Sequence, residues 1–184
     1  MNILVDKLPM DYKGLKINTN FRSFILFELL MQDRSFTAEE KMLLSLKLFY
    51  EKPPKDIKKA IEGILWFYGR GEQDKKSKAG ENSPKKAIYS YEHDAPLIYS
   101  AFWHDYRLDL NEVDYLHWWK FKSLFEGLNS ENLICEVMGY RAVDLSKIKD
   151  KDIKNKYKKL KKKWALPDER TEAEKEKDFA EAFW

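Results

Sequence analysis

The stretch DYLHWWKFKSLFEGL, from Asp114 to Leu128, decides the fold. Drawn as one helix at about 100° per residue, it has an apolar face about 140° wide, made of Val113, Trp118, Phe121, Leu124, Phe125 and Leu128. Tyr115, Leu116 and Trp119 fall outside that face and form a second apolar arc. A helix that is apolar nearly all round lies at the centre of its domain or is covered by a partner. The stretch carries no catalytic constellation, so it indicates packing and binding rather than chemistry.

Length and composition predict one soluble domain. The 184 residues are 43% hydrophobic, enough for a core, and 35% charged, which predicts a strongly solvated surface. The single cysteine, Cys135, excludes an internal disulfide and fits a reducing compartment, and its apolar neighbours predict a buried side chain. No apolar run approaches the roughly 20 residues that span a bilayer. The N-terminus lacks the basic start of a signal peptide. We therefore expect an intracellular protein without membrane contact.

Periodicity and capping residues predict a mainly α fold. The turn residues Pro9, Asp11 and Gly14 predict a short N-terminal β-hairpin, with Ile3 and Val5 on one side and Leu15 and Ile17 on the other. Helical spacing, N-caps, a Thr37–Glu40 capping box and terminating glycines and prolines predict the helices. The first four run over residues 21–31, 38–50, 57–68 and 95–106. The Trp-rich helix follows a cap at Asp109 or Asn111, the next helix runs from Ser130 and Asn132 through Met138 and ends at Gly139, and the last leads from Asp144 and Ser146 to Pro167.

A change in composition divides the chain without giving two independent domains. Residues 70–86 are almost entirely Gly, Lys, Glu, Asp, Ser, Asn and Pro, which predicts a disordered loop. We expect a single helical domain over residues 1–167, with a charged, partly mobile helical segment towards the C-terminus. Residues 168–184 form an acidic tail with an aromatic end.

The Lys-dense segment before Pro167 is the strongest charge feature. Ile153, Tyr157, Leu160 and Trp164 recur at helical spacing as one apolar stripe among many lysines. The functional interpretation is a basic surface for an acidic partner, an acidic lipid surface or nucleic acid. The structural interpretation, which we favour, is a helix docked by its stripe with lysines in water, since no base-reading residues interleave. If the surface is functional, its candidate contacts are Lys154, Lys158, Lys161 and Lys162.

The tail after Pro167 has the opposite charge and ends in aromatic residues. Phe179, Phe183 and Trp184 on an otherwise acidic segment are typical of a docking peptide that inserts anchors into a groove. A C-terminal helix packed on its own domain explains the same pattern equally well.

The titratable residues do not predict a catalytic or metal site. His93 and His104 lack the spacing of a metal pair, and His117 lies on the core face of the Trp-rich helix, where we expect a hydrogen-bonded core histidine. The carboxylates between residues 105 and 114 are explained by helix capping. Phosphate-loop, nucleophile-elbow, His-Glu-x-x-His and paired-cysteine motifs are absent from the sequence. We therefore predict no cofactor, no metal and no enzyme activity.

Three strings of the sequence resemble a phage family. They are VDKLPMDYKGLKINTNFRSFILFE (residues 5–28), DYLHWWKFKSLFEGL (114–128) and MGYRAVDLSKIKDKDIKNKYKKLKKKWALP (138–167). Together they resemble the bacteriophage Gp15 family of tailed phages and prophages of Gram-positive hosts. The resemblance implies a gene of the tail-morphogenesis module and a tail assembly chaperone, which keeps the long hydrophobic tape-measure protein soluble while tail-tube subunits polymerise around it. It implies action in the bacterial host cytoplasm during tail assembly, or residence in the virion tail.

The residues agree with such a role, because a chaperone of this kind needs apolar surface bounded by charge. Tyr115, Leu116 and Trp119 are the predicted client anchors, and the tape-measure and tail-tube proteins are the predicted partners. A homo-oligomer is left open. The alternatives are a minor structural protein of the tail and a phage regulator that binds nucleic acid through the Lys-dense helix. We do not favour nucleic acid as a partner.

Overall fold

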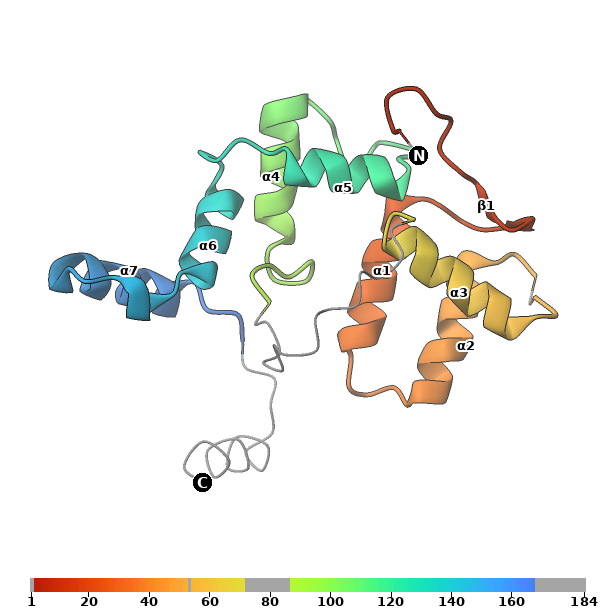
Figure 1. The fold of residues 1–184 in the computed structure, drawn as a ribbon, viewed down its shortest axis with the longest axis horizontal. Helices are drawn as coiled ribbons and strands as arrows, with labels where there is room; N and C mark the ends of the chain where they lie inside the picture. The colour runs from red at the N-terminus through yellow and green to blue at the C-terminus, as the bar shows by residue number, and fades with distance from the viewer. Residues whose placement is uncertain (1, 53, 72–86, 168–184) are drawn as a thin grey trace.

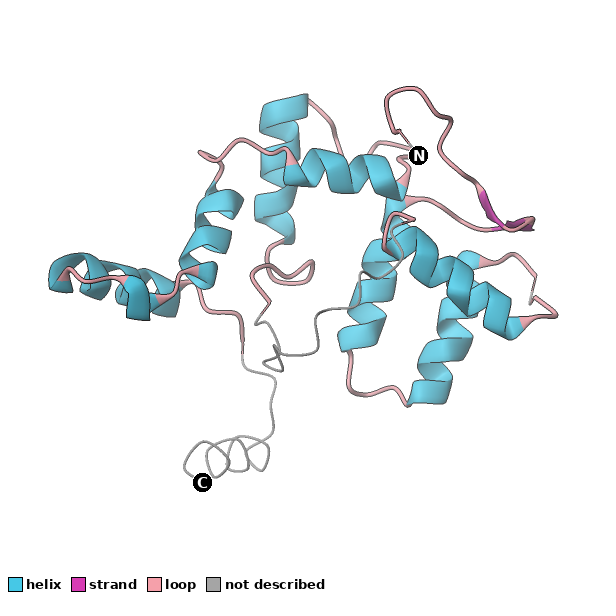
Figure 2. Cartoon of the chain, viewed as in Figure 1, coloured by secondary structure: helices cyan, strands magenta, loops and turns pink. Residues whose placement is uncertain are grey.

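The computed structural model describes residues 2–52, 54–71 and 87–167, and it confirms a mainly α-helical fold (Figures 1 and 2). The described residues form one two-stranded hairpin and seven α-helices. The elements are β1 (Asp11–Tyr12), β2 (Leu15–Lys16), α1 (Phe21–Gln32), α2 (Ala38–Phe49), α3 (Ile57–Tyr68), α4 (Ala95–Tyr106), α5 (Trp118–Glu126), α6 (Leu133–Ala142), a 3₁₀ turn η1 (Leu145–Lys147) and α7 (Lys151–Lys163). None of the described helices is long and apolar enough to cross a membrane.

The predicted hairpin is present, but its strands lie close to the turn. Tyr12 pairs with Leu15 and Asp11 with Lys16 in antiparallel register. The turn residues Lys13 and Gly14 both have positive φ, 50° and 81°, as a two-residue turn of this kind requires. The Asp11 carboxylate accepts the Gly14 N–H at 2.9 Å. The first strand is therefore at residues 11–12, and not at Ile3 and Val5 as expected.

The first three helices begin at the residues that the sequence predicts, and the caps of α1 and α2 are predicted ones. The Asn20 side chain accepts the Arg22 N–H at the start of α1, and Thr37 and Glu40 form a complete capping box on α2. Asp56 caps α3, which ends at Gly69. These local signals fix the helix ends, while the packing of their apolar faces fixes their arrangement.

The core is a chain of aromatic rings centred on α5. Trp118 stacks on Phe24 of α1 with 5.0 Å between ring centroids, and Phe121 stacks on Phe21 of α1 and Phe102 of α4 at 4.9 and 5.1 Å. These five side chains are at most 3% exposed. The helix α5 therefore joins the α1–α3 group to α4, as Figure 1 shows.

The Trp-rich helix begins later than the sequence predicts. Residues 116–118 pair with residues 19–21 instead: the Phe21 N–H donates to the Leu116 carbonyl at 2.9 Å, and the Trp118 N–H donates to the Thr19 carbonyl at 2.8 Å. A backbone engaged in extended pairing cannot also form a helical turn. The prediction of one helix from Asp114 is therefore wrong. The second apolar arc does not exist as a helix face, because Tyr115 and Leu116 precede the helix.

The last two helices also depart from the expected boundaries. Gly139 does not end α6, which continues to Ala142, and α7 begins at Lys151 after the η1 turn, with Asp150 as its N-cap. Glycine inside a helix costs only about 1 kcal/mol, and the contacts of Arg141 offset it. In Figure 1, α6 and α7 form an arm at the opposite side of the molecule from α2 and α3.

Candidate protein-binding surfaces

Trp119 belongs to the core and is not an exposed anchor. It is 4% exposed, and its indole ring packs against the rings of Trp66 and Phe67, at centroid distances of 5.2 and 5.7 Å. The indole Nε1 donates to the Phe67 carbonyl at 2.7 Å. The prediction of an exposed Trp119 is wrong because the later start of α5 turns this side chain towards the end of α3.

Tyr115 and Leu116 lie in the extended segment before α5. Leu116 is half-buried against the core, so it offers little contact surface. Tyr115 is 47% exposed, and its hydroxyl lies 2.7 Å from Thr19 Oγ1 and 3.5 Å from Met10 Sδ. Of the three predicted anchors, only Tyr115 presents a large apolar surface to solvent.

His117 is the buried, hydrogen-bonded histidine that the sequence predicts, but it caps α5 rather than lying within it. It is 3% exposed, its Nδ1 accepts the Trp119 N–H at 3.0 Å, and its Nε2 lies 3.0 Å from the Pro9 carbonyl. An acceptor at Nδ1 and a carbonyl beside Nε2 require the neutral ring with its proton on Nε2. Burial lowers the pKa of His117, which favours the same neutral form.

The four lysines predicted as partner contacts lie on α7, and they differ in exposure. Lys154, Lys158 and Lys162 are exposed, whereas Lys161 Nζ donates to the Val143 carbonyl at 2.7 Å and is half-buried. No residue of α7 is buried, and Ile153 at the start of its apolar stripe is 49% exposed. The stripe contacts α6, where the Tyr157 ring packs edge-on against Tyr140 at 6.3 Å.

The three tail anchors Phe179, Phe183 and Trp184 lie outside the described residues, as do residues 72–86 of the expected loop. Within the described part of the chain, no group of three or more His, Cys, Asp or Glu side chains could hold a metal ion. Cys135 is half-buried rather than fully buried, and desolvation raises the pKa of its thiol.

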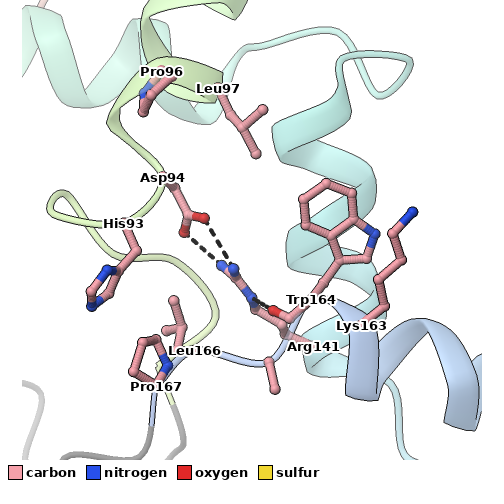
Figure 3. Close-up of a pocket in the computed structure, with 10 residues that line it drawn as sticks. His93, Asp94, Pro96, Leu97, Arg141, Lys163, Trp164, Leu166 and Pro167 are labelled. Carbon is pink, nitrogen blue, oxygen red and sulfur yellow. Dashed lines mark hydrogen bonds and ion pairs between the residues drawn. The ribbon is translucent and has the colours of Figure 1, made fainter.

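A buried ion pair between α4 and α6 was not anticipated from the sequence. Arg141 Nη1 and Nη2 donate to the two carboxylate oxygens of Asp94 at 2.5 and 3.0 Å, and both side chains are under 10% exposed. Arg141 Nε also donates to the Trp164 carbonyl at 2.6 Å, just after α7 (Figure 3). Asp94 therefore does not cap α4 with its side chain, although it precedes that helix. The sequence feature that could have indicated this ion pair is a lone arginine, Arg141, beside a lysine-rich segment. Arginine rather than lysine is favoured where both oxygens of a carboxylate are bound.

These residues line an open pocket of about 390 Å³ between α4, α6 and the end of α7. In Figure 3, Arg141 lies between Asp94 and Trp164, with its hydrogen-bonding groups directed at those two residues. The Arg141 guanidinium therefore binds α6 to α4 and to the end of α7. It is not free to bind a ligand in the pocket.

An exposed apolar surface at the α1–α2 loop was also not predicted from the sequence. Met31 follows the buried Phe24 and Phe27 on one stripe of α1, and Met42 precedes the buried Leu46 and Phe49 on one stripe of α2. Although both methionines occupy core-facing positions, they are 40% and 38% exposed, and Phe36 in the connecting loop is 38% exposed.

Figure 1 shows why the surface is open: the joined ends of α1 and α2 extend beyond α3 and α5, which cover only the other ends. Lys41 Nζ donates to the Met31 carbonyl at 2.7 Å and holds the two helices together there. We call Met31, Phe36 and Met42 the apolar tip.

A second exposed apolar region is the groove beside the N-terminal hairpin. It has a volume of about 650 Å³ and lies between residues 15–19 and the end of α2 at residues 47–52. Tyr115 and Met10, which is 45% exposed, also line it. We call it the hairpin groove.

The family model described as Bacteriophage Gp15 protein matches residues 4–166. No curated protein and no solved structure matches the chain.

Proposed function

Because the chain belongs to the bacteriophage Gp15 family, we propose that it is a non-enzymatic tail assembly chaperone. It binds the phage tape-measure protein, and the tail-tube subunits that polymerise around it, in the cytoplasm of the bacterial host. The work of such a protein is to cover apolar client helices until assembly buries them, which requires apolar surface that its own fold leaves uncovered.

The apolar tip is the observation that supports this proposal. Met31 and Met42 continue the core stripes of α1 and α2 past the point where other helices cover them. A client helix laid across this end completes the packing of both stripes, as a helix does in a hydrophobic groove. Methionine is unbranched and polarisable, so it adapts to clients of varied sequence.

Co-expression tests the proposal directly. The tape-measure protein of the same phage is produced in bacteria alone and together with this chain. We expect it to be insoluble alone, and soluble and co-purified when the chain is present. A tape-measure protein that stays insoluble, or that is soluble but never co-purifies, contradicts the chaperone role.

Mass spectrometry of purified virions separates the chaperone from a minor structural protein of the tail. A chaperone leaves when assembly ends, so its peptides are absent from mature particles. Stoichiometric peptides in the virion support the structural role instead.

A nucleic-acid-binding regulator is the second candidate, and α7 favours it. Eight of its 13 residues are lysines and none of them is buried. Binding through phosphates predicts an affinity for duplex DNA that falls steeply with salt concentration. Absence of binding at low salt eliminates this candidate.

A further inference from the structure

We propose that the hairpin groove is a docking site for a partner segment that combines apolar and acidic side chains. This proposal rests on the proposed function, because it names the chemistry of a client segment. The groove is separate from the apolar tip: it lies at the end of α2 that follows Lys47, whereas the tip lies at the start of α2.

The walls of the groove are fixed by backbone contacts. The Asn18 N–H donates to the Phe49 carbonyl at 2.9 Å, which ties the segment after β2 to the last residue of α2. The Ile17 N–H donates to the Met10 carbonyl at 3.1 Å and extends the hairpin pairing by one residue. A groove whose walls are held in this way loses little conformational entropy when it binds a ligand.

Tyr115 supplies a rigid aromatic surface within the groove. Its ring is about half exposed, yet its hydroxyl is held by Thr19 Oγ1, a side chain that is 1% exposed. Met10, whose sulfur lies 3.5 Å from the same hydroxyl, adds a flexible apolar surface beside the ring. An exposed aromatic side chain that is already held in one orientation is typical of a binding hot spot.

The charge around the groove identifies its occupant. Lys16, Lys47 and Lys52 line it, against the single carboxylate of Glu51. All three lysines are exposed, and none of them makes an ion pair with another residue of the described ranges. Three ammonium groups around an apolar surface are complementary to carboxylates that flank an apolar side chain. The occupant is therefore an acidic, apolar protein segment.

A peptide array tests this assignment with the complete chain. Overlapping peptides cover the tape-measure and tail-tube proteins of the same phage, and the wild-type chain is applied at low and at moderate salt. We expect the bound peptides to contain apolar residues flanked by Asp or Glu. We also expect the triple variant K16E/K47E/K52E to lose about tenfold or more in affinity for them.

The matched control is K154E/K158E/K162E, which reverses three exposed lysines of α7 with the same change in net charge. It retains the affinity of the wild type if the groove is the site. Tyr115→Ala weakens binding, whereas Tyr115→Phe keeps the ring and most of the affinity. Circular dichroism verifies that each variant is folded.

The following results overturn the proposal. They are bound peptides that are basic or uncharged, equal losses in the groove and α7 variants, and binding of an oligonucleotide of similar length in preference to every peptide. An array without binding also overturns it. If the intact tape-measure protein still co-purifies in that case, the groove assignment fails while the chaperone role stands.

Discussion

The indole Nε1 of Trp119 donates a 2.7 Å hydrogen bond to the main-chain carbonyl of Phe67, so the first turn of α5 closes the last turn of α3. Trp118 makes the matching contact, from its own Nε1 to the Tyr68 carbonyl at 3.2 Å. The last carbonyls of a helix have no partner within the helix. Two adjacent tryptophans therefore donate to the last two carbonyls of α3, of which that of Phe67 also accepts the Arg70 N–H at 3.1 Å.

Trp119→Phe removes the indole donor while keeping an aromatic ring. We expect it to lower the free energy of unfolding by about 1–3 kcal/mol, from the lost hydrogen bond and the smaller ring. Urea denaturation followed by circular dichroism measures the change. Trp103→Phe is the control, because Trp103 is 47% exposed and its replacement should change stability by less than about 0.5 kcal/mol. Equal effects of the two substitutions would show that Trp119 is not part of the core.

His117 predicts a loss of stability in mild acid. Its pKa is lowered in the folded protein, chiefly by burial, so between the folded and unfolded pKa values the unfolded chain binds more protons. The contribution of His117 is complete above the ordinary pKa of about 6.5 and is lost as the pH falls below it. Protonation also removes the Nδ1 acceptor that caps the Trp119 N–H.

The variant His117→Asn isolates this effect, because asparagine keeps a capping acceptor but does not titrate. Unfolding free energies measured from about pH 8 to about pH 5 should fall more steeply for the wild type than for the variant. Burial raises the pKa of Glu28, which makes the folded state relatively more stable as the pH falls. Glu28 is present in both proteins, so its effect cancels in the comparison. Parallel pH profiles would refute the assignment.

The buried pair of Arg141 and Asp94 should be costly to break. Arg141→Met leaves an uncompensated carboxylate under 10% exposed, and we expect a loss of about 3–5 kcal/mol in stability. Arg70→Met is the matched control, since the Arg70–Glu126 pair is about 35–50% exposed and such pairs contribute about 1 kcal/mol or less. The double variant Arg141→Met, Asp94→Leu should recover part of the loss. No recovery would indicate that the other bonds of the two side chains, from Arg141 to the Ile88 and Trp164 carbonyls and from the Ser90 N–H to Asp94, outweigh the ion pair itself.

Two helical glycines should respond in opposite directions to replacement by alanine. A Cβ at Gly139 meets nothing within 4 Å, so Gly139→Ala should stabilise the protein by up to about 1 kcal/mol. A Cβ at Gly63 meets the Tyr50 hydroxyl at 3.0 Å and the Tyr12 side chain at 3.2 Å, so Gly63→Ala should destabilise it by about 1–3 kcal/mol. Thermal unfolding compares the two. A stabilising Gly63→Ala would mean that the hairpin does not pack closely on α3.

The apolar tip makes a prediction about client binding rather than stability. Met31→Glu with Met42→Glu should abolish solubilisation of the tape-measure protein, while the unfolding free energy changes little, because both side chains are about 40% exposed. Leu65→Glu is the control: this leucine is 55% exposed on α3, away from the tip. Full solubilisation by the double variant would exclude the tip as the client surface.

Local signals in the sequence predicted the helices well. The predicted caps at Asn20 and Thr37 bind N–H groups only a few residues further along the chain, so they can be predicted without knowledge of the fold. The start of α5 was not predictable in this way. It depends on pairing between residues 19–21 and 116–118, which are distant in sequence, and that pairing overrides the helical periodicity of the intervening side chains.

The candidate surfaces were predicted less well for the same reason. Trp119 has the pattern of an anchor, but only the position of α3 determines that it is buried. The methionines of the tip have the pattern of core residues, and only the lengths of α1 and α2 relative to their neighbours expose them. Tyr115, for which the sequence allowed either core or surface, is exposed, and it lies on an extended segment and not on a helix.

The position of α5 in the chain has a consequence for synthesis on the ribosome. The elements α1 and α3 are translated first, but the side chains that cover Phe24 and bind the carbonyls of α3 come from residues 118–121. Contacts between such distant segments form only after both have left the exit tunnel, and proteins rich in them fold more slowly. The aromatic side chains of the nascent N-terminal half therefore stay exposed to solvent until α5 has been synthesised, and only then does this half complete its folding.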